Sequence, residues 1–405
     1  MMGMLDAHPF LASFLWVALS VVLFALFISV VVMALTWLER KVMGRLQARR
    51  GPTVNGPFGL LQPIADAIKL ISKEDFVPGK TDKFSFWIAP VVVFAPAFMV
   101  WVTIPFTRNI GVRNLDMGLI YVLAVMGVSI VGMLMAGWGS ANKYSALGGA
   151  RAAAQLISYE LPMVLGVMGV VMIAGSTDLR VIAEGQGGLL GWNILKQPLG
   201  FLLVFLAGLA EVGRTPFDIP YAESELMGGP FLEYSGIHWA MFQLAEYAST
   251  FLVAVLAVLL FLGGWHGFAP AGGVGRQVFE AFWLFSKVTV VMLFIFWIRA
   301  TVPRFRIDQL MGLAWKVFVP LTIVNVLITA FYLYYGWPAW TSTLMSLATL
   351  AVAWTIVNRN RRSQRTRPVL RTVHHAAKPA PPAPVAATPP PAPAAASVPD
   401  SGTRA

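Results

Sequence analysis

The most regular feature of this sequence is a succession of long apolar runs separated by short polar segments. Several runs are free of charged residues over more than the roughly 20 residues that span a bilayer as a helix. Helices are expected because each one satisfies its own backbone hydrogen bonds within lipid. We therefore predict an all-α, polytopic helical membrane protein. Nine transmembrane spans are expected, at residues 10–38, 84–107, 117–138, 161–176, 198–213, 237–265, 279–300, 313–335 and 338–357.

An amphipathic helix is predicted in the polar segment after the first span, from residue 58 to residue 72. Its apolar face holds Leu60, Leu61, Ile64, Ile68 and Ile71, and its polar face holds Gln62, Asp66, Lys69 and Lys73. Such a helix is expected to lie along the membrane interface. It is either a simple anchor or part of a ligand entrance.

A further helix is expected over residues 144–159, directly before the fourth span. It leads into Glu160-Leu161-Pro162. Proline removes a backbone hydrogen bond and bends a helix locally. Glu160 is therefore predicted to lie near a distortion.

Lys and Arg are distributed unequally over the segments between spans. With the N-terminus outside, the inner segments hold 24 of the 30 basic residues and the outer segments hold five. Basic residues accumulate on the cytoplasmic side of a membrane. We therefore expect an outside N-terminus, a cytoplasmic C-terminus, and cytoplasmic segments at residues 39–83, 211–246 and 299–316. The net charge of +11 thus reflects topology rather than nucleic-acid binding.

The chain divides into three predicted parts. Residues 1–336 form the membrane core, and residues 337–358 form an additional C-terminal transmembrane helix. From residue 359 the sequence is first basic and then rich in Ala and Pro, a composition that cannot bury enough surface to fold. We expect a disordered tail whose arginines stay near anionic lipid.

The composition limits the chemistry that the chain can perform alone. The absence of Cys excludes disulfides and thiolate-bound metal or iron–sulfur centres. Three His are isolated and two lie in the tail, so neither a haem nor a metal site is predicted. No phosphate-binding GxxxxGK[ST] motif, GxSxG elbow or helical pair of His indicates an independent catalytic site. Any redox centre must then belong to a partner.

Acidic residues are scarce and concentrated in one stretch. Only 19 Asp and Glu occur in 405 residues, and six of them lie between residues 211 and 246. These six are Glu211, Asp218, Glu223, Glu225, Glu233 and Glu246. A solvated loop would explain Asp218, Glu223 and Glu225. It does not explain Glu211 and Glu246, which belong to apolar spans, where carboxylates are costly and usually functional.

Carboxylates at the edge of a span can exchange protons near neutral pH, because desolvation favours their protonated form. When several lie close together their titrations are coupled, so a nearby charge redistributes their protons. Glu160, Glu211 and Glu246 are the best candidates for this role. Lys287 lies inside a span, and it is either a partner for one of these acids or a side chain that snorkels to the interface.

Three long motifs in these cytoplasmic segments are similar to those of a known family. They are ERKVMGRLQARRGPTVNGPFGLLQPIADAIKLISKED, then LAEVGRTPFDIPYAESELMGG followed by EYSG and AEY, and then WIRATVPRFRIDQLMGLAWK. In this order they resemble the family of the quinone-site membrane subunit of respiratory complex I, the proton-pumping NADH:quinone oxidoreductase. The resemblance covers about residues 10–336 and implies a core of eight spans. The ninth span and the tail are additions to it.

The resemblance implies a narrow chamber through which a quinone, ubiquinone or menaquinone, reaches the last iron–sulfur cluster of a neighbouring subunit. The chamber residues that it implies are Glu39, Arg40, Asp66, Lys69, Arg299, Arg304, Arg306 and Asp308. NADH, FMN and the iron–sulfur clusters would be bound by partner subunits. Hydrophilic subunits would lie at the cytoplasmic loops and small membrane subunits beside the core, in a bacterial cell membrane.

The resemblance also implies a five-helix core similar to half of an antiporter-like proton channel. A path of acids would couple quinone reduction to proton movement. Its members are Glu160, Glu211, Asp218, Glu223, Glu225, Glu233 and Glu246, to which we add Lys287.

This chain departs from the family pattern at one position of the acidic loop. Tyr221 stands where family members commonly carry an acidic residue, and the Leu-Met-Gly-Gly-Pro-Phe stretch after Glu225 is atypical. Either a neighbouring acid substitutes for the missing carboxylate or the position is dispensable.

Two other functions remain open at this point. One is the equivalent subunit of a membrane-bound hydrogenase-type complex, although the long PFDIPYAESEL loop favours a quinone-linked enzyme. The other is a freestanding ion-coupled transporter, which would explain buried acids together with a buried lysine.

Overall fold

The computed structural model describes residues 9–188, 191–219, 227–268 and 273–366. Within these ranges the regular elements are all helices, and no strand occurs. Residues 1–354 form one compact unit and residues 355–405 form a second. All contacts discussed below lie within the first unit.

Eight helical segments of the described chain are long and apolar enough to cross a membrane, which confirms the predicted polytopic helical class. Five are the single helices α2 (Pro9–Leu46), α5 (Gly118–Gly139), α6 (Lys143–Ala174), α11 (Gly236–Phe261) and α12 (Gly273–Thr301). A sixth is α15 (Ala339–Thr366). The other two are α4 (Lys83–Met99) continued by the turn η2 (Val100–Thr103), and α13 (Ile307–Leu313) continued by the π-helix η5 (Ala314–Phe318) and α14 (Val319–Tyr335).

The remaining predicted span, at residues 198–213, corresponds to α9 (Pro198–Val212). This helix has 15 residues. At 1.5 Å per residue it is about 22 Å long, which is shorter than the hydrocarbon core of a bilayer. The other short elements are η1 (Pro57–Gly59), α3 (Gln62–Ser72), α7 (Leu179–Glu184), α8 (Asn193–Lys196) and η4 (Gly229–Phe231).

The predicted start of the amphipathic helix was wrong. The amphipathic helix α3 begins at Gln62 rather than at residue 58, because Phe58 has a φ of 57° and cannot belong to a right-handed helix. The first helix continues eight residues beyond Leu38, to Leu46. Glu39, Arg40 and Lys41 therefore lie in the last turns of α2.

The helix predicted at residues 144–159 and the fourth span form one continuous helix, α6, which runs through Pro162. Gln155 of this helix donates through Nε2 to the carbonyl oxygens of Ala210 and Phe217, both at 2.7 Å. These bonds fix the end of α9 and the loop after it against α6.

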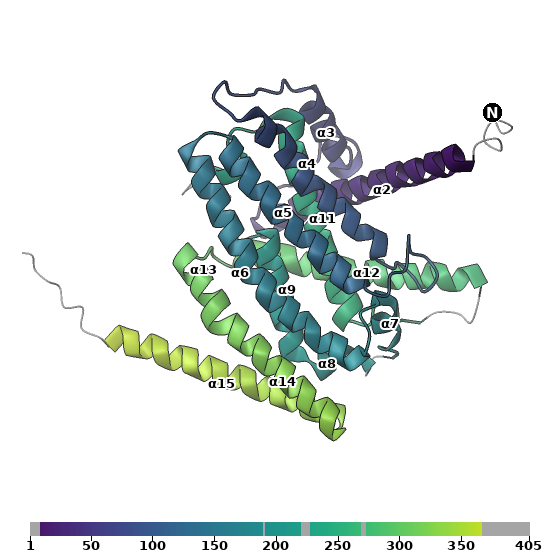
Figure 1. The fold of residues 1–405 in the computed structure, drawn as a ribbon, viewed down its shortest axis with the longest axis vertical. Helices are drawn as coiled ribbons and strands as arrows, with labels where there is room; N and C mark the ends of the chain where they lie inside the picture. The colour runs from purple at the N-terminus through teal and green to yellow at the C-terminus, as the bar shows by residue number, and fades with distance from the viewer. Residues whose placement is uncertain (1–8, 189–190, 220–226, 269–272, 367–405) are drawn as a thin grey trace, which may run out of the picture. The chain divides into compact units, whose positions relative to one another are not determined.

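Helix α11 is the central helix of the first unit. The most apolar part of α11 is 83% buried, and the helix contacts α2, α3, α4, α9 and α12. Helices α4, α5, α6 and α9 follow one another side by side, and α14 packs against α6 (Figure 1). Because protein surrounds α11, polar groups on it face other side chains rather than lipid.

Much of the apolar face of α3 is exposed in the described chain. Ile64, Ile68 and Ile71 are 46%, 62% and 69% exposed. This is the pattern expected of a helix whose apolar face contacts lipid or a partner.

Candidate functional site

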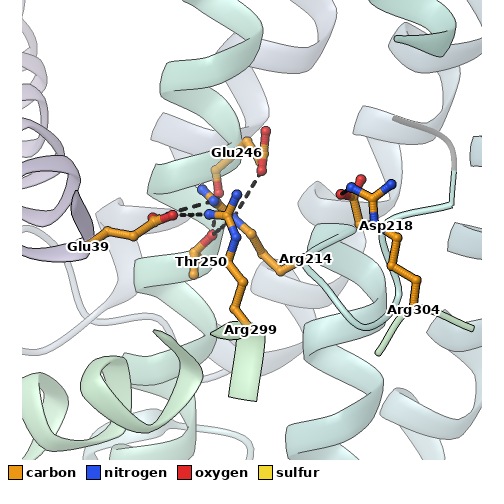
Figure 2. Close-up of polar contacts among 7 residues, drawn as sticks. All are labelled: Glu39, Arg214, Asp218, Glu246, Thr250, Arg299 and Arg304. Atoms are coloured by element: carbon orange, nitrogen blue, oxygen red, sulfur yellow. Dashed lines mark hydrogen bonds and ion pairs between the residues drawn. The ribbon is translucent and has the colours of Figure 1, made fainter. Parts of the chain in front are cut away.

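Four charged side chains from different segments meet in the interior (Figure 2). Arg214, which follows α9, is 4% exposed, and Glu39 of α2 is 5% exposed. Arg214 lies between two carboxylates, with Nη1 3.5 Å from Glu39 Oε2 and Nε 3.0 Å from Glu246 Oε1. Arg299 of α12 also pairs with Glu39. We call Glu39, Arg214, Glu246 and Arg299 the central network. Its two cations and two anions compensate one another where an isolated charge would be costly.

The end of α9 positions Arg214. Gly213 adopts a φ of 73°, the left-handed conformation that glycine allows at a helix C-terminus. The backbone N–H of Arg214 then donates to the carbonyl of Leu209 at 3.3 Å. The side chain points toward α11, where Nε also donates to Thr250 Oγ1 at 3.3 Å and the guanidinium lies 4.1 Å from the ring centroid of Tyr247.

A second ion pair joins the loop after α9 to the loop after α12 (Figure 2). Nη2 of Arg304 donates to Asp218 Oδ2 at 2.8 Å, and the backbone N–H of Phe305 donates to the Pro216 carbonyl at 3.2 Å. Burial raises the pKa of Asp218 to about 6; the charge of Arg304 opposes this rise, and that of Glu246 adds to it. Asp218 can therefore bind and release a proton near neutral pH.

These charged groups surround a polar cavity of about 780 Å³. Its charged lining residues are Arg214, Asp218, Glu246, Arg299 and Arg304. A cavity of this size can hold a ring-sized polar group together with water.

Glu246 also lines a second, much smaller cavity of about 50 Å³ between α4, α5, α6, α9 and α11. Glu211 of α9 lines the same enclosed cavity, with Ser129 and Ser249. Oε2 of Glu211 is buried and has no hydrogen-bond partner among the described residues. The enclosed cavity has room for a few water molecules, and the carboxylates and hydroxyls supply the polar partners that such water needs.

Glu160 of α6 lies against α5, next to Gly127. A Cβ added to Gly127 of α5 would lie 2.8 Å from Glu160 Oε1, so the absence of a side chain there gives the carboxylate its space. The negative charges of Glu160 and Glu211 act on one another. Of the predicted acids, Glu211 and Glu246 thus line one cavity, and Glu160 lies near enough to Glu211 for their charges to interact.

A separate apolar groove of about 530 Å³ lies between α2, α3, α11 and α12. Its lining includes one or more residues of each helix, among them Trp37 of α2, Ile64 of α3, Phe251 of α11 and Met292 of α12. Trp37 and Leu38, which line the groove, directly precede Glu39 of the central network. A long apolar molecule in the groove would therefore have its end close to charged groups.

Arg40 and Asp66 connect α2 to α3 at the edge of this groove. Arg40 Nη1 lies 2.5 Å from Asp66 Oδ2, and Gln62 Nε2 donates to Asp66 Oδ1 at 3.0 Å. Burial alone would raise the pKa of Asp66, but the bonds from Arg40 and Gln62 and the charge of Lys69 outweigh it and hold the pKa below its usual range. Lys69 itself is exposed.

The remaining predicted chamber residues lie apart from the central network. Arg306, the N-cap residue of α13, and Asp308 in its first turn are exposed, and they line none of the three cavities described above. Glu233, a predicted path residue, accepts a hydrogen bond of 2.7 Å from Asn142 Nδ2, and Asn142 caps the N-terminus of α6. Its observed contact is therefore with a helix cap.

Lys287 does not contact an acid in the described part of the chain. Its Nζ donates to three backbone carbonyls just beyond the end of α11, those of Leu262, Gly264 and His266, at 2.9, 3.0 and 2.8 Å. The ammonium also lies 4.7 Å from the ring centroid of Trp192. The observed geometry is that of a cation that caps a helix C-terminus.

Glu223, Glu225 and Tyr221 lie outside the described residues. Arg214 was absent from the predicted site, although it holds two of its acids together. Its position three residues after a glutamate at the end of an apolar span, in EVGR, was the only sequence signal for it.

Comparisons with known proteins identify the family. A family model described as NADH dehydrogenase matches residues 19–330. A protein named as the H subunit of NADH-quinone oxidoreductase, from Dehalococcoides mccartyi (strain CBDB1), is 47% identical over 318 residues, which are 78% of this chain and 87% of the relative. Proteins with the same name from Geobacillus kaustophilus (strain HTA426) and Brevibacillus brevis (strain 47 / JCM 6285 / NBRC 100599) are 48% and 45% identical, over 78% and 81% of this chain and 94% and 96% of the relatives.

The family-model match covers the three motifs quoted in the sequence analysis, and together with the named relatives it confirms the resemblance inferred from them. The family-model match ends at residue 330, before α15 begins at Ala339. The chain belongs to the NADH dehydrogenase family, together with the proteins named as the H subunit of NADH-quinone oxidoreductase.

Proposed function

We propose that this chain is the membrane subunit of a proton-pumping NADH:quinone oxidoreductase that receives the quinone and couples its reduction to proton movement. The observation that carries the proposal is the position of Glu246. This carboxylate lines both the polar cavity and the enclosed cavity that holds Glu211, and it shares Arg214 with Glu39. One network of charges thus connects a ligand-sized cavity to the interior acids.

The quinone is proposed to enter through the apolar groove. The groove between α2, α3, α11 and α12 suits an isoprenoid tail, and the charged groups beside it suit a carbonyl-bearing headgroup. Arg299 and Arg304 line the polar cavity and would donate hydrogen bonds to the headgroup oxygens. The electrons would come from an iron–sulfur cluster of a hydrophilic partner subunit.

Reduction of the quinone adds two electrons and requires two protons to form the quinol. Asp218, with its pKa of about 6, is placed to supply one of them from the cavity wall, and the second would come from water in the polar cavity. Negative charge on the headgroup would attract Arg299 and Arg214. Arg214 would then stabilise the ionised form of Glu246 less strongly, so a proton would move toward Glu246 and from there to Glu211 and Glu160.

The orientation proposed from the basic residues places the polar cavity on the cytoplasmic side of a bacterial cell membrane. Hydrophilic subunits that carry NADH, FMN and iron–sulfur clusters would bind there. Small membrane subunits and lipid would cover the outer faces of the bundle. Residues 337–358 are proposed as an additional transmembrane helix and residues 359–405 as a cytoplasmic tail.

Co-purification tests the assignment to a complex. The affinity-tagged full chain should recover hydrophilic proteins with flavin and iron–sulfur absorbance, and the assembly should oxidise NADH with a quinone as acceptor. Recovery with nickel-containing hydrogenase subunits would instead support the hydrogenase-type complex. A stable chain without partners that transports ions in liposomes would overturn the proposal.

Single Gln variants of Glu160, Glu211 and Glu246 test the proton path within that assembly. Each variant should lower proton pumping by roughly tenfold or more, because a neutral amide cannot exchange a proton. Glu184→Gln is the matched control, since Glu184 is a half-exposed partner of Arg108 at 2.9 Å and lines neither cavity. Normal pumping by all three path variants would contradict the assignment.

A further inference from the structure

A third groove, separate from the polar and enclosed cavities, lies where α2 leaves its apolar section. It has a volume of about 350 Å³ and is formed by the end of α2 and the turn η1. Trp37 and Val42 come from α2, and Phe58 and Leu60 come from the turn and the residue after it. The indole Nε1 of Trp37 donates to the Phe58 carbonyl at 3.3 Å, so the two walls are joined.

The walls of this groove are apolar, but two cations stand at its polar end. Lys41 and Arg45 both line the groove and are four residues apart on α2, so they lie on the same face of the helix. In the described part of the chain neither makes an ion pair with a carboxylate. The neighbouring Arg40 differs, because it is paired with Asp66.

This arrangement has the chemistry of a membrane interface. Trp is enriched where the apolar core of a bilayer meets its headgroups, and here Trp37 stands one turn before Lys41. Lys41 Nζ lies 6.0 Å from the Trp37 ring centroid. Phe58 is 78% exposed and Leu60 is 55% exposed, so apolar surface continues outward from the groove.

We propose that this groove binds an anionic phospholipid, with the phosphate held by Lys41 and Arg45 and an acyl chain along Trp37 and Phe58. Charge complementarity selects this occupant, because two unpaired cations at the end of an apolar groove match a phosphate ester that carries a hydrocarbon chain. A zwitterionic lipid would bring an ammonium group toward the same two cations. Compensation of the helix dipole accounts for cations at the end of α2 but not for the apolar groove beside them.

The lipid site borders the apolar groove assigned to the quinone tail. Trp37 and Leu60 line both. A lipid chain bound there would form part of the rim over which a quinone passes. The lipid proposal itself does not depend on the quinone assignment, because lipid binding can be measured without turnover.

Photolabelling of the full chain in nanodiscs tests the site. The probe is a phosphatidylglycerol with a photoreactive diazirine on one acyl chain, in a background of phosphatidylcholine, and the matched probe is a diazirine phosphatidylcholine. Mass spectrometry should locate phosphatidylglycerol adducts on residues 37–42 and 57–60, with about tenfold preference over the phosphatidylcholine probe. Equal labelling by the two probes would show that these residues are ordinary lipid-facing surface without a preference for anionic lipid, and it would overturn the proposal.

The double variant Lys41→Gln/Arg45→Gln should remove this preference, because both phosphate contacts are lost. Arg49→Gln/Arg50→Gln is the matched control, since it removes the same charge from the same segment but from residues that do not line the groove. An equal loss in both variants would mean general attraction to a basic segment and would overturn the site. Lys41→Arg/Arg45→Lys keeps both charges and should keep the preference, which separates loss of binding from loss of folding.

Discussion

Arg214 and Glu246 form an ion pair of 3.0 Å in the interior, and the same guanidinium reaches Glu39 on a different helix. The side chain of Arg214 is 4% exposed and follows the turn at Gly213, so it is held between these two carboxylates. Any change in charge near Glu39 therefore alters how strongly Glu246 is held. Arg214 therefore couples the charge state of Glu39 to that of Glu246.

Arg214→Lys should uncouple quinone reduction from pumping. A lysine ammonium keeps the charge but has no planar fork with which to hold two carboxylates at once. We expect an assembled enzyme that reduces quinone with fewer protons moved per electron. The ratio is measured in inverted vesicles from the NADH oxidation rate and the initial quenching of a pH-sensitive dye.

Arg214→Gln provides the contrast. It leaves Glu39 and Glu246 without the cation between them, and breaking a buried pair in this way typically costs about 3–5 kcal/mol. The variant should therefore assemble poorly, as judged by the amount of complex in the membrane. A lysine variant with an unchanged proton-to-electron ratio would show that Arg214 only supports the structure.

Asp218 should make the stability of the protein depend on pH below neutrality. Its pKa in the folded state, about 6, is above the ordinary value near 4, so the folded state binds this proton more tightly than the unfolded state. The stability that this group contributes is therefore greatest below about pH 4 and is lost as the pH rises to about 6. Asp218→Asn should remove this component of the slope in a thermal-unfolding series.

Asp66 is the matched control for that series. Its pKa is held below the usual range in the folded state, so its contribution has the opposite sign and is lost as the pH falls. Asp66→Asn should therefore flatten the decline in stability at low pH rather than the change near pH 6. A pH profile that Asp218→Asn leaves unaltered would contradict the assigned protonation.

The helices could be predicted from the sequence because the transfer of an apolar run into lipid is decided locally, within one segment. The start of α3 could not, since the positive φ of Phe58 belongs to a tight turn in which Gly59 packs against the Pro52 carbonyl. The small number of Asp and Glu residues in the sequence identified the acids as candidates. It could not distinguish a carboxylate that lines a cavity, such as Glu211, from one that binds a helix cap, such as Glu233. Arg214 escaped notice because its partners come from two helices, α2 and α11, that meet it only in the folded chain.

Gly127→Ala should displace the Glu160 carboxylate without removing it. The new Cβ would lie 2.8 Å from Oε1, and the flexible end of a glutamate can move away at little cost in stability. The normal heat stability of the assembled complex should be retained while proton pumping falls, because the Glu160 carboxylate leaves the position that it holds relative to Glu211. Gly312→Ala is the control, since an added Cβ there meets no atom within 4 Å. Equal pumping by the two alanine variants would show that Glu160 is not part of the proton path.

Lys287 provides the test that distinguishes a helix cap from a proton carrier. Lys287→Gln shortens the side chain and removes the ammonium that three carbonyls share, so groups near the end of α11 lose hydrogen bonds. Loss of such bonds at a partly buried site typically costs about 1–3 kcal/mol, and the midpoint of thermal unfolding should fall. The number of protons moved per electron should stay at the normal value in the enzyme that does assemble, because no acid of the described chain contacts this lysine. Lys287→Arg should recover most of the stability, since a guanidinium can donate to several carbonyls. A Gln variant that unfolds normally but pumps fewer protons would instead restore Lys287 to the proton path.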